Sequence, residues 1–175
     1  MVRIKRETTM KQKIHFIITG GTIDASYSPP HQTAKPNTVS IIPGYIEKVI
    51  KPHFAATFET LCMKDSRDIT DAVRRKMIAA IKKTKTDHIV ITHGTDTLAR
   101  TADFLNEHLG NTKKTILLVG AMVPLKDMVQ SDAGFNLGFA AGSFAALSPG
   151  VYICMNGGIF KPGTVEKNAR KARFE

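Results

Sequence analysis

A repeated alternation of short apolar runs and amphipathic segments constrains the fold of this chain more than any other feature. Five apolar runs are expected to form strands: KIHFIIT (13–19), AATFETLCM (55–63), HIVIT (88–92), TILLVGAM (115–122) and GVYICM (150–155). Apolar residues at helical spacing occupy residues 44–50, 70–85, 98–109 and 131–147. Because strands that are apolar throughout are buried on both faces, they are typical of parallel sheets. The pattern predicts an α/β fold, with a single doubly wound domain and a mostly parallel sheet covered by helices on both faces.

The chain is predicted to contain a flexible basic leader at residues 1–12 and one domain at residues 13–175. Residues 24–40 carry three prolines and no periodicity, which indicates a long loop. Loops of this length in compact domains are often functional lids. Three glycines stand four apart in the last helical segment, which predicts close backbone packing there: Gly134, Gly138 and Gly142.

The net charge of +10 raises the question of nucleic-acid binding. Basic residues gather in the leader, in residues 74–85 and near the C-terminus. The middle group is expected on the solvated face of an amphipathic helix. Because the sequence has neither zinc-finger spacing nor an RNP-type aromatic motif, specific nucleic-acid binding is not predicted.

Several classes of protein do not fit the sequence. No apolar run approaches the ~20 residues that span a bilayer, and the first apolar stretch is too short for a signal peptide. We therefore predict no membrane partner and a cytoplasmic location. Cys62 and Cys154 lie in apolar runs, which predicts core cysteines without a disulfide framework. The six histidines form no metal-binding array, so no metal or other cofactor is predicted.

Small and polar residues follow the predicted strands. The turns after the first four strands are Gly20-Gly21-Thr22, Asp65-Ser66-Arg67-Asp68, His93-Gly94-Thr95-Asp96 and Gly120-Ala121. Because the carboxyl ends of parallel strands share one edge, where ligands collect, these turns predict a binding or catalytic site.

Each turn also has a simpler interpretation. Gly20-Gly21 is compatible with a plain tight turn, whereas a phosphate-binding loop lacks both G-x-G-x-x-G and a Walker lysine. Thr95 or Asp96 is compatible with helix capping, worth ~1 kcal/mol, although one capping residue would not explain the whole cluster. His93 is compatible with a base or a ligand, but a hydrogen-bonded histidine near the core is favoured.

The residue types in these turns suit acyl transfer on a small zwitterionic substrate. A threonine hydroxyl becomes a nucleophile when a base takes its proton. A partly buried lysine can serve as that base, and an aspartate can orient the lysine or bind an ammonium group. Backbone N–H groups at glycine-rich turns can stabilise an oxyanion or hold a carboxylate.

Four blocks of sequence resemble a known family: TGGTI (19–23), THGTDT (92–97), VGAMVP (119–124) and SDAGFNL (131–137). They are similar to the signature blocks of the bacterial-type L-asparaginases, amidohydrolases that use a threonine nucleophile. The resemblance covers nearly the whole chain after the leader, but it extends only over the N-terminal domain of family members about twice this length. The chain thus resembles a short-chain member that matches the N-terminal asparaginase domain only.

The resemblance implies catalytic roles for five residues. Thr22 would be the nucleophile that attacks the side-chain amide. Tyr27 would assist it when the loop closes over the substrate. Thr95, Asp96 and Lys167 would form a second triad that helps to activate the nucleophile or the water.

The resemblance also implies a substrate-binding set. Ser66 would hold the α-carboxylate of the substrate, while Asp96 would also accept its α-ammonium. The backbone at Thr95 and Ala121 would contact the oxyanion or the amide. Arg67 stands where many family members have a smaller or uncharged polar residue, so it is expected to alter affinity and amide preference. The family further implies a homo-oligomer, a dimer or a tetramer.

The leading hypothesis is hydrolysis of L-asparagine to L-aspartate and ammonia through an acyl-threonine intermediate, without a cofactor. One alternative is a glutaminase or the ammonia-releasing component of a tRNA-dependent amidotransferase. Another is a non-catalytic module that binds an amino acid.

Overall fold

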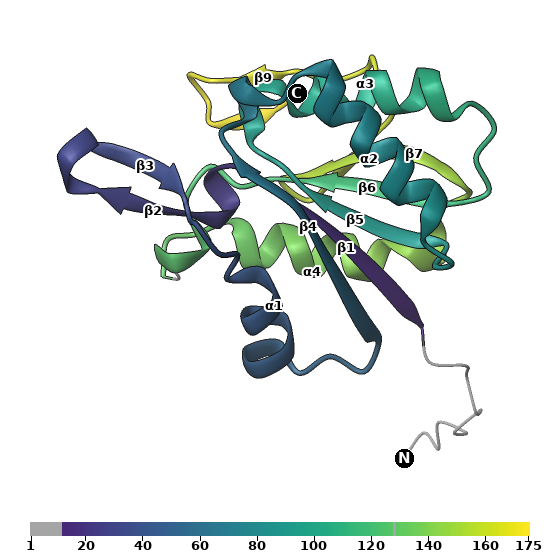
Figure 1. Ribbon diagram of the computed structural model, residues 1–175, viewed down its shortest axis with the longest axis horizontal. Coiled ribbons are helices and arrows are strands. Elements are labelled where there is room, and N and C mark those ends of the chain that lie inside the picture. The colour runs from purple at the N-terminus through teal and green to yellow at the C-terminus, as the bar shows by residue number, and fades with distance from the viewer. Residues whose placement is uncertain (1–11, 128) are drawn as a thin grey trace.

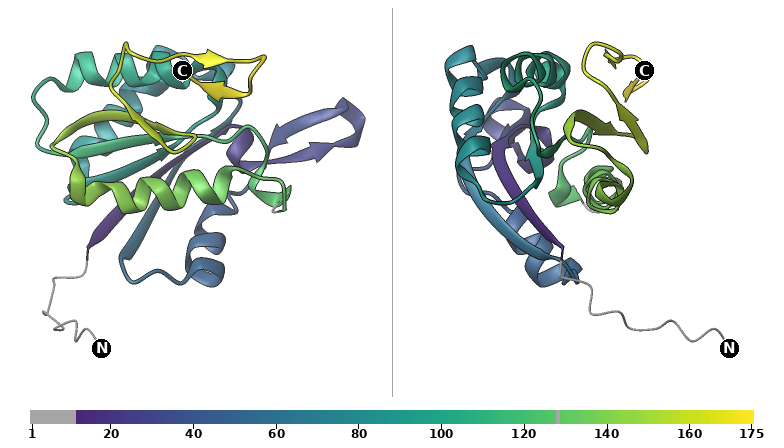
Figure 2. Two further views of the ribbon diagram at one scale, coloured as in Figure 1. Left: turned by 180° about the vertical axis from the view of Figure 1, so that it is seen from behind. Right: turned by 90° about the vertical axis from the view of Figure 1, so that its right-hand side faces the viewer.

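The computed structural model describes residues 12–127 and 129–175 and places one central sheet between two layers of helices (Figures 1 and 2). The strand order is β4-β1-β5-β6-β7-β8. The strands are β1 (Lys13–Gly20), β4 (Ala55–Lys64), β5 (His88–Thr92), β6 (Thr115–Val119), β7 (Gly150–Met155) and β8 (Gly158–Phe160). All neighbouring pairs are parallel except that of β7 with the edge strand β8. The predicted doubly wound α/β fold is confirmed.

The helices are divided between the two faces of the sheet (Figure 2). One face is covered by α2 (Asp71–Lys83) and α3 (Leu98–Leu109). The other is covered by α1 (Ile42–Gly44), its π-helical continuation Tyr45–Ile50, and α4 (Ala133–Ser143), which continues as the 3-10 turn Phe144–Ala146. Successive residues of a strand point to opposite faces. In β1, Ile17 joins the core under α2 and α3, while Phe16 and Ile18 join the core over α1 and α4. Because both faces of β1 are buried, its sequence has to be apolar at successive positions.

The direction of winding changes between the neighbouring strands β1 and β5. After β1 the chain crosses to β4 on one side, and after β5 it crosses to β6 on the other side. In open α/β sheets, ligands bind in the crevice outside the carboxyl ends of two such strands. The turns that follow β1 and β5 border that crevice.

Residues 24–40 are not the irregular loop that the sequence predicts. Within them β2 (Ala25–Ser28) and β3 (Thr33–Pro36) pair as an antiparallel hairpin, and a 3-10 turn at Pro29–His31 joins the two strands. The hairpin extends away from the sheet (Figure 1). The prediction was wrong because short exposed strands bury too little apolar surface to show a period of two residues.

A second hairpin lies near the C-terminus and consists of β9 (Lys167–Asn168) and β10 (Arg173–Phe174). Phe174 is 1% exposed and joins the core under α2 and α3. Its backbone N–H donates to Oδ1 of Asn156, just after β7, at 3.0 Å. These contacts attach the hairpin to the body of the molecule.

Two predictions about helix surfaces were wrong in part, although the other basic residues of 74–85 are exposed as predicted. Arg74 is not solvated but only 1% exposed, because its guanidinium has partners on α2 and α3. Gly138 and Gly142 do not permit close packing, since a Cβ on either would meet nothing within 4 Å in the described chain. Gly134 does pack closely, with its added Cβ 2.6 Å from the Tyr45 hydroxyl. The predicted leader lies outside the described residues except for Gln12.

Candidate active site

A backbone contact between Gly21 and Gly94 lies at the crevice between β1 and β5. A Cβ added to Gly21 would stand 2.2 Å from the Gly94 nitrogen, and one added to Gly94 would stand 3.1 Å from the Gly21 Cα. Gly21 also has a φ of 80°, which favours glycine. Thr22 and Thr95 directly follow these two glycines, so the structure brings their turns together.

Gly20 is explained by the close approach of β1 to β4. Gly20 has a φ of 90°, and a Cβ on it would lie 2.5 Å from the Lys64 nitrogen. The Gly21 N–H donates to the Lys64 carbonyl at 2.8 Å. The Gly21 amide is therefore already bonded within the fold. The tight-turn interpretation accounts for both glycines but not for Thr22, whose side chain is partly exposed.

Ser66, at the end of β4, lies against the same glycine contact. It is 4% exposed, and a Cβ on Gly94 would lie 3.0 Å from its Oγ. Thr97 Oγ1 donates to the Ser66 carbonyl at 2.7 Å and ties the turns after β4 and β5 together. Thr97 is the N-cap residue of α3 and forms no side-chain capping bond there. Capping therefore does not account for Thr95 or Asp96.

The turn after β6 lies against Thr95. A Cβ on Gly120 would stand 3.0 Å from Thr95 Cγ2, and the next residue, Ala121, is fully buried. Asp132 accepts hydrogen bonds from the two backbone amides after Ala121 at 2.9 and 3.0 Å. Asn136 Nδ2 donates to the Gly120 carbonyl at 3.1 Å. The polar residues of the SDAGFNL block thus hold this turn in place, a role that the sequence analysis missed although their i, i+4 spacing was visible.

Asp96 lies between two cations. The Lys167 ammonium on β9 donates to Asp96 Oδ1 at 2.5 Å, and Arg67 Nε lies 3.9 Å from Asp96 Oδ2. Arg67 also donates to Asp65 through Nε at 2.9 Å and Nη2 at 3.2 Å. These bonds lower the pKa of Asp65 and raise the pKa of Arg67. Between Lys167 and Thr95 no hydrogen bond is formed in residues 12–127 and 129–175.

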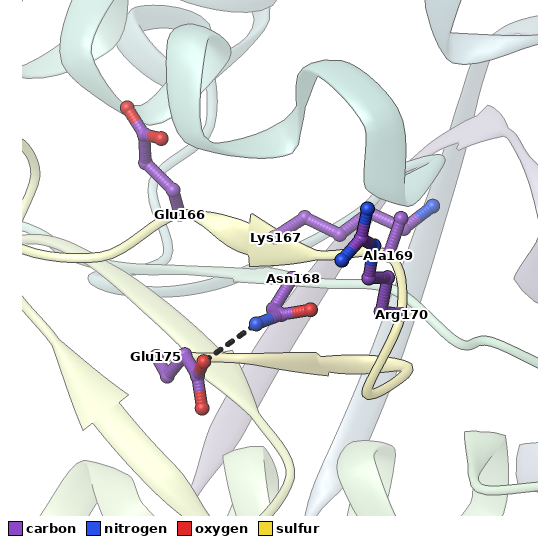
Figure 3. A pocket seen from close by; sticks show the side chains of 6 residues that line it. All are labelled: Glu166, Lys167, Asn168, Ala169, Arg170 and Glu175. Atoms are coloured by element: carbon purple, nitrogen blue, oxygen red, sulfur yellow. Dashed lines mark hydrogen bonds between the residues drawn. The ribbon is translucent and has the colours of Figure 1, made fainter.

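Lys167 also borders a shallow hollow beside the C-terminal hairpin (Figure 3). The hollow is lined by Glu166, Lys167, Asn168, Ala169, Arg170 and Glu175. Asn168 Nδ2 donates to Glu175 Oε1 at 2.6 Å across it. This bond joins β9 to the residue that follows β10 and so stabilises the backbone that carries Lys167.

Tyr27 is not brought to the strand-end turns. It lies on β2 with 65% of its surface exposed and lines a groove with Val39, Ile41 and Lys126. The base of its hairpin is fixed by the buried Asp24, which the sequence analysis did not single out. Asp24 Oδ1 accepts from Asn37 Nδ2 and from the Ile41 N–H, each at 3.0 Å.

His93 is a scaffold residue, as the sequence analysis favours. Its Nδ1 lies 2.8 Å from the Gly94 carbonyl, so Nδ1 carries the proton and Nε2 accepts from Thr101 Oγ1 at 3.1 Å. Thr101 in turn accepts from Arg74 Nε at 3.0 Å, and Arg74 Nη1 donates to Asp71 at 2.7 Å. Burial lowers the pKa of His93 to about 4. A neutral histidine therefore supports the residue that precedes Thr95.

Other candidate features have no place in this site. Cys154 is buried and Cys62 is partly buried, both are free thiols, and burial raises the pKa of each, that of Cys154 to about 12. Within the described part of the chain, no group of three or more His, Cys, Asp or Glu side chains is placed to hold a metal ion. In those same residues, no helix is both long and apolar enough to cross a membrane.

The structure thus assembles most of the predicted set. Ser66, the glycines before Thr22 and Thr95, and the turn at Ala121 form one packed cluster. Lys167 and Arg67 join it through Asp96. Tyr27 stays outside it. The cluster combines hydroxyls, a lysine–aspartate pair and backbone N–H groups at the edge of a sheet, a composition suited to acyl transfer.

Comparison with known proteins agrees with the resemblance seen in the sequence. The sequence model described as "Asparaginase, N-terminal" matches residues 13–173. A glutaminase-asparaginase of Acinetobacter glutaminasificans is 32% identical over 167 residues, which cover 90% of this chain and 50% of that protein. This chain spans about half the length of the curated relatives that it matches.

Two solved structures show the same fold at higher coverage of this chain. L-asparaginase I from Vibrio cholerae has a TM-score of 0.80 at 26% identity, covering 95% of this chain and 51% of that one. A protein from Campylobacter jejuni described as a probable cytoplasmic L-asparaginase has a TM-score of 0.77 at 29% identity, with coverage of 94% and 53%. The similarity therefore extends through the whole sheet and its site edge.

Proposed function

The chain belongs to the asparaginase family, whose N-terminal domain it matches, and we propose that it hydrolyses L-asparagine to L-aspartate and ammonia. The reaction proceeds through an acyl-threonine intermediate and needs no cofactor. The observation that carries this proposal is the Gly21–Gly94 contact, which sets the turns of Thr22 and Thr95 side by side at the switch point of the sheet.

In the proposed first half-reaction, Thr22 Oγ attacks the carboxamide carbon of the substrate. The second triad, Thr95, Asp96 and Lys167, takes the hydroxyl proton. Backbone N–H groups at Thr95 and Ala121 donate to the oxyanion of the tetrahedral intermediate. When the C–N bond breaks, the proton passes to the departing nitrogen and ammonia leaves.

In the second half-reaction, water attacks the acyl-threonine ester. The same triad takes a proton from this water, and the ester C–O bond to Thr22 breaks. The product carboxylate leaves, and the Thr22 hydroxyl regains its proton. The Lys167–Asp96 bond of 2.5 Å supports this assignment, because it holds the ammonium nitrogen beside the turn that carries Thr95.

The substrate is anchored by its other polar groups. Ser66 holds the α-carboxylate, and its burial against Gly94 supports a fixed position for that contact. Asp96 faces the α-ammonium, and Arg67, the residue after Ser66, lies on the same side. Tyr27 assists Thr22 only after the β2–β3 hairpin moves toward the sheet, since its side chain is largely exposed in the present position.

Replacing the nucleophile tests the proposal. T22A is expected to abolish ammonia release from L-asparagine while leaving the unfolding transition unchanged, because Thr22 is only partly buried. T22S should retain a measurable rate. The matched control is T60A, an exposed threonine on β4. Ammonia release by T22A at the wild-type rate would show that the assigned mechanism is wrong.

Hydrolysis of L-glutamine is the alternative that a specific observation favours. The Acinetobacter glutaminasificans relative is named a glutaminase-asparaginase. Parallel assays of both amides on the same preparation give the ratio of the two activities. An ammonia-releasing component of a tRNA-dependent amidotransferase would in addition bind tRNA, and a non-catalytic amino-acid-binding module would bind its ligand without releasing ammonia.

We further propose a cytoplasmic homo-oligomer, a dimer or a tetramer, with a small-molecule substrate and no specific nucleic-acid partner. The Campylobacter jejuni neighbour supports the compartment. The outer face of α4 supports the assembly, because Phe135 is 61% exposed there and Gly138 and Gly142 leave the helix surface open. Sedimentation equilibrium measures the number of subunits.

A further inference from the structure

Arg67 places a positive charge beside Asp96, the carboxylate proposed to face the substrate's α-ammonium. It lies in the turn after β4, directly after Ser66, and its side chain is 74% exposed. Its guanidinium donates twice to Asp65 and lies 3.9 Å from Asp96 Oδ2. The side chain is therefore held across the mouth of the site.

Both oxygens of Asp96 face cations. Oδ1 accepts from Lys167 at 2.5 Å, and Oδ2 faces Arg67. A substrate ammonium placed against this carboxylate would have two like charges on the same group. Arg67 is also paired with Asp65, so the two carboxylates and the two cations at this edge balance, and no unmatched negative charge remains to attract the ammonium. Asp96 is thus poorly suited to recognise a free ammonium in this chain.

The groove beside Arg67 is better suited to a neutral or anionic group than to an ammonium. A groove of about 440 Å³ lies between β3 and the end of β4, and its charged lining consists of Lys35, Lys64, Asp65, Arg67 and Asp68. Asp65 is already bonded to Arg67. With that pair set aside, the groove is lined by two cations, Lys35 and Lys64, and one carboxylate, Asp68. The groove therefore favours a neutral or anionic group.

We propose that Arg67 sets the substrate class: the preferred substrates are carboxamides that carry a neighbouring carboxylate but no free α-ammonium, such as succinamate or an N-acylated asparagine. This inference rests on the proposed amidohydrolase function. The bonds made and broken are those of the asparagine reaction, with water consumed and ammonia released. L-asparagine remains a substrate, but a poorer one.

The test compares ammonia release from succinamate, N-acetyl-L-asparagine and L-asparagine. For the full chain, kcat/KM of succinamate or N-acetyl-L-asparagine is expected to exceed that of L-asparagine at least tenfold. R67Q should move this ratio at least tenfold toward L-asparagine, mainly through KM. R67K keeps the charge and should keep most of the preference.

R100Q is the matched control, because Arg100 is 71% exposed and pairs with Asp71 at 3.8 Å rather than with Asp65 or Asp96. It should leave the ratio unchanged. A wild-type preference for L-asparagine that R67Q does not alter would overturn the inference while leaving the amidohydrolase proposal intact. Release of no ammonia from any of the three amides would instead overturn the proposed function.

Discussion

The strand-end cluster and the two hairpins contribute to the same candidate site by different physical means. In the cluster, Gly21, Gly94 and Ser66 approach so closely that an added Cβ on Gly21 or Gly94 would overlap its neighbours. In the hairpins, Tyr27 is 65% exposed and Lys167 reaches the site through its ion pair with Asp96. Backbone packing thus sets the threonine turns, whereas Tyr27 and Lys167 lie on hairpins outside the glycine contacts. Substitutions of the packed glycines should therefore change stability, and substitution of Lys167 should change the rate.

The largest expected effect is that of G21A in the cluster. The new Cβ would lie 2.2 Å from the Gly94 nitrogen, at a φ of 80°. Backbone strain costs ~1–3 kcal/mol, and overpacking costs a further ~1–3 kcal/mol. The free energy of unfolding, measured by urea titration, should fall by about 2–6 kcal/mol, from a total of ~5–15 kcal/mol typical of small domains.

G138A is the control for this prediction, because a Cβ on Gly138 meets nothing within 4 Å. In the interior of α4, alanine should raise the free energy of unfolding by ~0.5–1 kcal/mol. Equal stability of G21A and the wild type would contradict the view that backbone packing positions Thr22 and Thr95.

Removing the lysine of the C-terminal hairpin should lower the rate and leave stability nearly unchanged, the reverse of the effect expected for G21A. K167M deletes the cation bonded to Asp96 at 2.5 Å and should lower kcat for amide hydrolysis by ~10² or more. The unfolding free energy should change by less than ~1 kcal/mol, because an ion pair with an exposed partner contributes little to stability. Steady-state kinetics and urea titration on one preparation measure both quantities.

K171M tests whether the rate effect is specific to position 167. Lys171 lies in the same hairpin and pairs with Glu175 at 3.0 Å, away from Asp96. Its replacement should leave kcat within twofold of the wild type. A K167M variant with near-normal kcat would remove Lys167 from the triad and leave the proton acceptor for Thr22 to be found elsewhere.

The cluster was predictable from the sequence and the hairpins were not, for one physical reason. Buried parallel strands must be apolar on both faces. The apolar runs HIVIT and TILLVGAM therefore show in the sequence where two strands lie and where their carboxyl ends are. The polar turns at those ends then converge by topology alone. The β2–β3 hairpin has no such mark, since its strands are mostly exposed and rich in serine and proline.

Contacts between distant segments were equally hidden. The burial of Arg74 is not visible in the sequence, because Arg75 and Lys76, which follow it on α2, are exposed and its partner Thr101 lies on another helix. Similarly, the sequence does not reveal that Asp132 bonds the backbone after Ala121. Such side-chain bonds depend on how helices are placed on the sheet, which the apolar period does not determine.

The smallest expected effect is a pH dependence inside the cluster. His93 has a pKa of about 4 in the folded chain, below its ordinary value of 6.5, because burial disfavours the charged imidazolium. Above pH 6.5 both folded and unfolded chains hold it neutral, and its contribution to stability is complete. Between pH 6.5 and 4 only the unfolded chain takes up the proton, so stability falls. At pH 5.5 the loss should be ~1.4 kcal/mol.

H93Q should flatten this part of the stability curve, since glutamine does not titrate. Urea titrations at pH 7.5 and 5.5 isolate the contribution of His93 from that of His15, whose pKa burial also lowers. H108Q, at an exposed position on α3, should keep the wild-type slope. An unchanged slope in H93Q would mean that His93 is not buried as a neutral group. The hydrogen bonds from Arg74 through Thr101 and His93 would then not be what fixes the turn before Thr95, and the rigidity of the cluster would rest on the glycine contacts alone.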